Sequence, residues 1–245
     1  MSDSMKKAVQ KISILKGQSF AYELSEQFEC IQQMPGGNRI FNKILSADQD
    51  QLEDYLAEIR YALIFSGLGF QIQVYPLGRK GPDLKISRNG NHAVVEITRF
   101  RKEFPGPPEL VLDVVDPILP IYGNPKRDVK KSLDKIHSKY KQITNENAII
   151  AIWNDDGDLD EIEVRIAVND IIRDACEGKI PVPSNLSFVL YGCNWINLSN
   201  KQQLYCFPLG NQESYIIGWQ NELKRSIVSG LIQRALALSS VSLTR

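Results

Sequence analysis

Residues 79–102, RKGPDLKISRNGNHAVVEITRFRK, carry the clearest turn signal in the chain. Asn89-Gly90 suits a two-residue type I′ turn, which needs positive φ at both central positions. Before this dipeptide, residues 83–86 alternate between polar and apolar. After it, residues 93–100 are rich in β-branched side chains, which strands favour. The segment therefore predicts a β-hairpin with Asn89-Gly90 at its tip.

A hairpin with this turn places Arg88 opposite Asn91 and, further from the tip, Asp83 opposite Glu96. Directly opposed residues point to the same face of a sheet, with Cβ atoms roughly 4.5–5.5 Å apart. Two like charges in that position are destabilising unless something compensates for them. A shared metal ion would do so, and so would a raised pKa on one of the two carboxyls.

The motif around these acids resembles the PD-(D/E)xK signature of the restriction-endonuclease-like nuclease superfamily. Pro82-Asp83 matches its first part and Glu96-Ile97-Thr98 its second, with Thr98 where the signature has lysine. The resemblance covers roughly residues 50–155. It implies hydrolysis of a DNA or RNA phosphodiester with Mg²⁺ or Mn²⁺, with Asp83 and Glu96 as metal ligands and DNA favoured over RNA. An ordinary hairpin with a polar outer face is the alternative.

A helix over residues 50–66 is predicted by its apolar face and by Ser46 and Gln49, which have the spacing of a capping box. Glu58 lies at the rim of that apolar face, where a carboxylate can reach the edge of a sheet packed beneath it. The resemblance implies that Glu58 is a third metal ligand. A solvated surface glutamate is the alternative. A strand over residues 70–75 follows the helix.

The missing motif lysine has two candidate substitutes. Lys85 lies two residues after Asp83, so both side chains point to the same strand face, and Glu96 is its diagonal neighbour. We therefore predict a catalytic role for Lys85, with Thr98 able to donate a hydrogen bond but carrying no charge. Lys139 could instead approach from the next helix. Lys85 could also simply neutralise the two carboxylates or extend to solvent.

That next helix, over residues 126–144, carries the main basic surface of the sequence. Its cations recur at i, i+4 spacing, which places them on one face of the helix. We expect this row to contact nucleic-acid phosphates, although a solvated helix face is an equal alternative. The resemblance extends here to the segment Lys139-Tyr140-Lys141-Gln142. The predicted nucleic-acid-binding residues are Arg127, Lys131, Lys135, Lys139 and Gln142.

The remaining segments suggest one α/β domain over residues 1–245, with a mixed sheet between helices and a core order of α-β-β-β-α-β. We expect a helical N-terminal extension over residues 1–45, which could be a cap, a dimerisation surface or a substrate clamp. The core spans residues 46–155 and includes a proline-rich loop over residues 101–125, either a flap or a meandering surface loop, and a buried strand over residues 147–153. The C-terminal additions, residues 156–245, contain predicted helices over 162–176 and 215–238 and short strands over 188–191 and 204–207.

Composition limits the partners and the chemistry. Lys+Arg and Asp+Glu are both 29, so any nucleic-acid surface must be a local patch. The four cysteines form no CxxC pair and there are two histidines, which disfavours structural zinc. We expect a cytoplasmic protein, because the cysteines are most simply reduced core residues. We expect no membrane partner, because no apolar run approaches the roughly 18 residues of a membrane span. The sequence is compatible with a homodimer and does not determine the oligomeric state. The main alternative to a nuclease is a catalytically inactive nuclease-like fold that binds nucleic acid or protein.

Overall fold

In the computed structural model of the chain, six strands of the described residues form one mixed sheet, in the order β1-β2-β3-β4-β5-β6. β3 pairs with β4 and β4 with β5 in parallel, whereas the other neighbours are antiparallel. The strands are β1 (Gln71–Val74), β2 (Leu84–Arg88), β3 (Asn91–Phe100), β4 (Ala148–Asn154), β5 (Leu186–Asn194) and β6 (Gln202–Pro208). The structure describes residues 1–78, 81–100, 125–143, 146–154, 159, 161–194 and 202–209.

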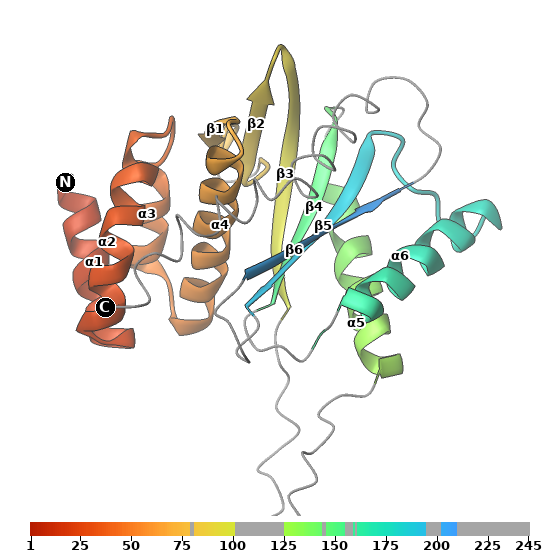
Figure 1. Cartoon of the computed structure of the whole chain (residues 1–245), viewed down its shortest axis with the longest axis horizontal. Helices are drawn as coiled ribbons and strands as arrows, with labels where there is room; N and C mark the ends of the chain where they lie inside the picture. Colours follow the sequence, from red (N-terminus) through yellow and green to blue (C-terminus); the bar gives the residue numbers. More distant parts are fainter. Residues whose placement is uncertain are drawn as a thin grey trace, which may run out of the picture.

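Helices cover both faces of the sheet, which confirms the predicted α/β fold class (Figure 1). One face packs on α4 (Gln49–Gly67), and beyond it lie α1 (Asp3–Lys16), α2 (Gln18–Gln33) and α3 (Asn38–Ser46). The other face packs on α5 (Pro125–Lys139), which continues into the short 3₁₀ helix η2 (Tyr140–Gln142), and on α6 (Glu161–Cys176).

β4 is buried at every position because it lies between two hydrophobic clusters. Its alternate residues Ile149, Ala151 and Trp153 join the cluster on the α4 side, and Ala148, Ile150 and Ile152 join the cluster on the α5 and α6 side. This is the burial expected of a strand covered on both faces, and it confirms the buried strand predicted over residues 147–153.

The hairpin has the predicted turn and register. Asn89 and Gly90 have φ values of 51° and 80°, as a type I′ turn requires. Arg88 pairs with Asn91, and the regular ladder ends where Leu84 pairs with Val95. The next opposed pair, Asp83 and Glu96, therefore lies just outside the ladder.

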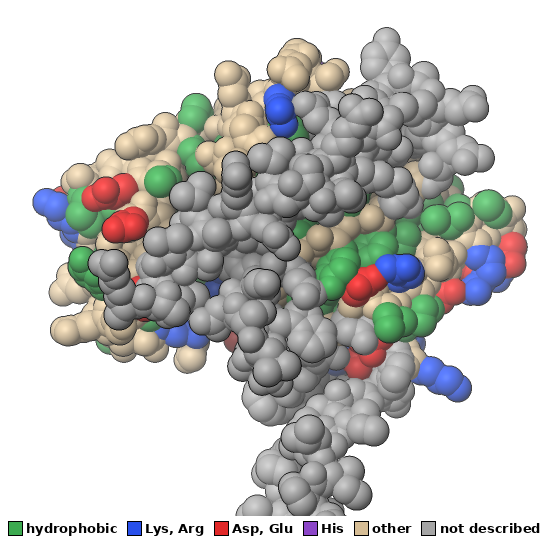
Figure 2. All heavy atoms as spheres, in the orientation of Figure 1, with side chains coloured by type: hydrophobic (Ala, Val, Ile, Leu, Met, Phe, Trp, Pro, Cys, Tyr) green, Lys and Arg blue, Asp and Glu red, His purple; other side chains and the backbone are tan. Residues whose placement is uncertain are grey.

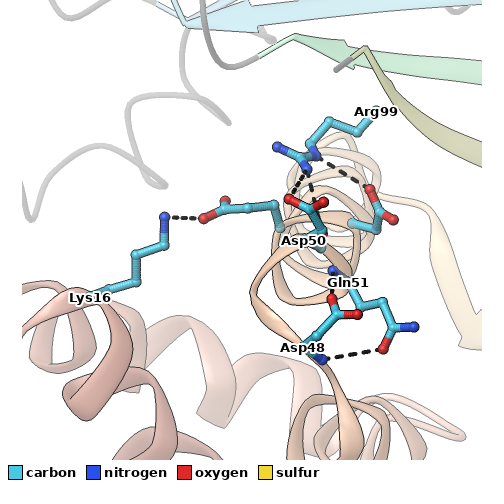
Figure 3. Close-up of polar contacts among 7 residues, drawn as sticks. Lys16, Asp48, Asp50, Gln51 and Arg99 are labelled. Carbon is cyan, nitrogen blue, oxygen red and sulfur yellow. Dashed lines mark hydrogen bonds and ion pairs between the residues drawn. The ribbon is translucent and has the colours of Figure 1, made fainter. Parts of the chain in front are cut away.

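The N-terminus of α4 differs from the prediction. The capping box expected at Ser46 and Gln49 is wrong, because Ser46 is the last residue of α3. Asp48 caps the helix: its side chain accepts from the Gln51 amide at 2.8 Å, and Gln51 Oε1 accepts from the Asp48 amide at 3.3 Å (Figure 3). The observed box has the same three-residue spacing as the predicted one but lies two residues further along the chain.

Ion pairs hold the same end of α4 on two sides (Figure 3). Arg99 of β3 donates to Asp54 at 3.3 Å and to the Asp50 carbonyl at 3.4 Å. Lys16 of α1 pairs with Glu53. Arg99 points away from the face that carries Glu96, since alternate strand residues face opposite sides.

The C-terminal strands β5 and β6 continue the central sheet and are longer than the sequence indicated. The helix α6 agrees with the predicted helix over residues 162–176. The proline-rich loop (residues 101–124) and the helix predicted over residues 215–238 lie outside the described residues. Figure 2 shows charged side chains of both signs close together on the N-terminal helices and around α6.

Candidate functional site

Three carboxyl groups from three elements gather where β2 begins. Glu58 of α4 is 7% exposed and Glu96 of β3 is 3% exposed. Burial, with the nearby Asp83 charge, raises the pKa of Glu58 to about 8 and that of Glu96 to about 7. Burial also raises the pKa of Asp83. Both glutamates respond to the charge of Asp83, so the three predicted acids form one electrostatically linked group.

The hairpin and β1 together hold Asp83 in place. The Ile97 amide donates to Asp83 Oδ2 at 2.8 Å, and the Tyr75 amide donates to the Asp83 carbonyl, also at 2.8 Å. On β3, Val95 and Ile97 join the cluster beneath α4, whereas Val94 joins the cluster beneath α5. Glu96 shares the face of Val94 and therefore faces α5.

A lysine does reach this group, from α5. Lys139 is the last residue of that helix, and its Nζ lies 3.4 Å from Glu96 Oε2. Its side chain is only 17% exposed. The Lys139 charge lowers the pKa of Glu96, and that of Asp83 and Glu58 as well, which partly offsets the effect of burial. Of the two candidate substitutes for the missing motif lysine, Lys139 is therefore the one that lies beside Glu96.

Lys85 has a different contact. It pairs with Val94 in the ladder as predicted, but its Nζ lies 2.7 Å from Glu146 Oε2. His92 Nε2 lies 3.5 Å from the same oxygen. Thr98 is half-buried in β3 opposite Ile152 of β4. The catalytic roles expected of Lys85 and Thr98 stay predictions, and the geometry favours Lys139 as the cation beside Glu96.

Two further residues, Tyr75 and Lys43, lie at the group and were not predicted from the sequence. The Tyr75 hydroxyl donates to Glu58 Oε2. Lys43 of α3 places its Nζ 3.4 Å from the centroid of the Tyr75 ring and 5.3 Å from that of Tyr55. Neither position stands out in the sequence, because Tyr75 ends an ordinary alternating strand and Lys43 lies in a helix to which no chemistry was assigned.

The donor atoms suit a hard divalent cation. Glu96 Oε1 is buried and has no hydrogen-bond partner among the described residues, and a cation would satisfy it. In the described ranges, no group of three or more His, Cys, Asp and Glu side chains is arranged to hold an ion unaided. Mg²⁺ commonly binds through one or two carboxylates and keeps several waters, so Asp83 and Glu96 would suffice.

The basic row of α5 runs toward the same place. Lys131 and Lys135 are half-buried along the helix that ends at Lys139, and Gln142 is exposed in η2 just beyond. The side chain of Arg127 lies outside the described residues. The row borders the buried side of α5, formed by Asp128, Ser132 and Ile136. These lysines therefore lead along α5 to the carboxylates.

Comparisons with protein-family models, with curated proteins and with solved structures give no match. The resemblance to the PD-(D/E)xK superfamily stays a prediction that depends on the motif residues. Within the part of the chain that the structure describes, no helix combines the length and the apolar character needed to cross a bilayer.

Proposed function

We propose that the protein is a metal-dependent nuclease that hydrolyses phosphodiester bonds of DNA or RNA. The observation that carries the proposal is the environment of Glu96. One of its carboxylate oxygens is buried without a hydrogen-bond partner among the described residues, and the other lies 3.4 Å from Lys139 Nζ. Burying acids beside one another costs stability, and such arrangements cluster at functional sites because the chemistry requires them.

Each residue has a role that follows from its position. Asp83 and Glu96 would hold Mg²⁺ or Mn²⁺, which when bound lowers the pKa of a water and neutralises charge on a phosphate. Lys139 favours the ionised form of Glu96 and would donate to a phosphate oxygen of the substrate. Glu58 accepts from Tyr75 through Oε2, which leaves its second oxygen for water in the site.

Nucleic acid is supported as the substrate by the lysine row on α5. Lys131 and Lys135 lie on the helix face that ends at Lys139, so a phosphate backbone lying along α5 would reach the carboxylates. Contacts of this kind position a strand and carry no sequence information, so we propose cleavage with little sequence preference.

The test compares the parent with Asp83→Asn, Lys139→Met and Lys85→Met on single- and double-stranded DNA and RNA, with Mg²⁺, Mn²⁺ or EDTA. We expect metal-dependent cleavage that Asp83→Asn abolishes. Lys139→Met should lower the rate by about 10²-fold, the scale of losing one electrostatic partner of the transition state, whereas Lys85→Met should retain most of it. Circular dichroism checks that each variant is folded.

A parent that cleaves none of the four substrates would overturn the proposal. Nucleic-acid binding without cleavage would then support the inactive binding module, the function that Thr98 at the motif lysine position favours. Loss of cleavage in Lys85→Met but not in Lys139→Met would return the catalytic role to Lys85.

A further inference from the structure

Lys43 of α3 is a second cation at the carboxylate group. Its side chain is half-buried, and its Nζ lies over the Tyr75 ring at 3.4 Å from the centroid. An ammonium has three N–H donors, and among the described residues no hydrogen bond or ion pair uses those of Lys43. Lys139, by contrast, is paired with Glu96. Among the described residues, Lys43 therefore keeps all three of its N–H donors for an anionic ligand, whereas Lys139 already donates one to Glu96.

The connection between the N-terminal helices and β1 fixes the position of Lys43. The Val74 amide donates to the Pro35 carbonyl at 2.8 Å, and Arg39 Nη1 donates to the Tyr75 carbonyl at 2.7 Å. Gly36 packs so closely that a Cβ there would lie 2.0 Å from the Val74 carbonyl oxygen. Arg39 and Lys43 are four residues apart on α3 and therefore share a helix face.

Tyr75 links this connection to the acids. Its φ is 48°, a left-handed conformation that is rare for a bulky residue and costs energy. In that conformation its amide donates to the Asp83 carbonyl and its hydroxyl donates to Glu58. The ammonium of Lys43 lies over the Tyr75 ring, between these two contacts. The strained residue is therefore held by α3 on one side and by two of the three acids on the other.

Lys43 and Lys139 act on the same acids from opposite sides of the sheet. The charge of Lys43 lowers the pKa of Glu58, Asp83 and Glu96, as that of Lys139 does. Lys139 approaches from α5, whereas Lys43 approaches from α3 on the α4 side. A bound nucleic acid would thus contact two cations supplied by different parts of the chain, Lys139 at the reacting phosphate and Lys43 at a neighbouring one.

We propose that Lys43 binds a phosphate of the nucleic acid, so that the N-terminal helices form part of the substrate site and not merely a cap on the core. This inference rests on the proposed function and adds a substrate-binding residue to it. The aromatic face of Tyr75 holds the ammonium by a cation–π contact and leaves its N–H donors for phosphate oxygens.

The experiment uses the full chain with Lys43→Met, Lys43→Gln and Lys43→Arg. The charge-matched control is Lys7→Met, on the exposed side of α1. Binding of a fluorescein-labelled single-stranded DNA oligonucleotide is followed by anisotropy in EDTA over a range of NaCl concentrations. We expect the Met and Gln variants to bind about tenfold more weakly, with the slope of log K against log salt reduced by roughly 0.7, the value for one phosphate of a single strand. Lys43→Arg and Lys7→Met should retain the parent's slope.

Cleavage with Mn²⁺ gives the second measurement. Lys43→Met should raise KM more than it lowers kcat, because a contact to a phosphate outside the reacting group contributes to binding in both states. A general loss of folding would not produce this split, and thermal melts check the fold. Two differently shaped neutral replacements guard against a packing defect in either one.

The outcomes separate this inference from the proposed function. A parent that cleaves, with Met and Gln variants that keep its KM and salt slope, would overturn the role of Lys43 and leave the nuclease function standing. A parent that binds with a slope reduced in these variants, but does not cleave, would support Lys43 and overturn catalysis. A parent that neither binds nor cleaves would overturn both.

Discussion

Replacing Glu58 by glutamine should make the protein more stable at alkaline pH. Burial and the Asp83 charge raise the pKa of Glu58 from 4.5 to about 8, so the folded chain holds a proton that the unfolded chain releases. A carboxyl with a raised folded-state pKa lowers the free energy of unfolding as pH rises between those two values. Its penalty is absent below about pH 4.5 and complete above about pH 8.

The size of the effect follows from the shift. Each pKa unit corresponds to about 1.4 kcal/mol, so the penalty at high pH is roughly 3–5 kcal/mol. Glutamine carries no titrating proton and keeps an oxygen that can accept from the Tyr75 hydroxyl. Glu58→Gln should therefore resemble the parent near pH 5 and exceed its stability by that amount at about pH 9. The corresponding rise in Tm is roughly 10 °C for a chain of this size.

Urea denaturation in EDTA at both pH values measures the difference directly. Glu29→Gln, an exposed position on α2, is the matched control and should change stability little at either pH. A Glu58→Gln variant that is less stable than the parent at about pH 9 would refute the reasoning, because the ionised carboxylate would then be stabilising the fold. If Glu58→Gln gained the same stability at both pH values, the effect would come from packing and not from charge.

Three further changes test the site and the sheet. Mn²⁺ should raise the Tm of the parent but not of Asp83→Asn, because an ion that binds only the folded chain stabilises it; an unchanged rise in the variant would place the ion elsewhere. Replacing Lys131 and Lys135 together by alanine should weaken nucleic-acid binding similarly across sequences and, on duplex DNA, reduce the salt slope by about one unit for each phosphate that a lysine neutralises; an unchanged slope would make the row a solvated face. Gly192→Ala should destabilise the fold by about 1–3 kcal/mol, measured by urea denaturation, because its Cβ would lie 2.7 Å from the Trp153 ring; wild-type stability would mean that the ring moves freely.

Local signals in the sequence predicted much of the core. Asn89-Gly90 determined the hairpin and its register because a type I′ turn leaves few alternatives for the flanking strands. The predicted bounds of the helix over residues 50–66 and of the apolar strand over residues 147–153 agree with the structure to within one or two residues. Their hydrophobic patterns indicate which faces are buried, one face for the helix and both for the strand. Asp83 and Glu96 followed from the register.

Side-chain destinations were harder to predict because they depend on elements distant in the sequence. The register of the hairpin makes Lys85 a diagonal neighbour of Glu96. Its flexible side chain nevertheless places its ammonium beside Glu146, which precedes β4. Lys43 lies over Tyr75, next to the acids, only because Arg39 of α3 donates a hydrogen bond to the Tyr75 carbonyl, an interaction with no periodic signal in the sequence. The addition of β5 and β6 to the central sheet is likewise a matter of long-range pairing.

The position of Lys139 bears on how the motif should be interpreted. The charge of a catalytic lysine acts through space, so the element that delivers it matters less than where its ammonium lies. Thr98 keeps the strand pattern of β3, while the helix that follows brings Lys139 to 3.4 Å from Glu96. In the proposed nuclease, the lysine of the signature would thus be absent from β3, and Lys139 of α5 would supply the positive charge in its place. A search for the motif along β3 finds threonine at the lysine position, whereas the folded chain brings Lys139 beside the acids.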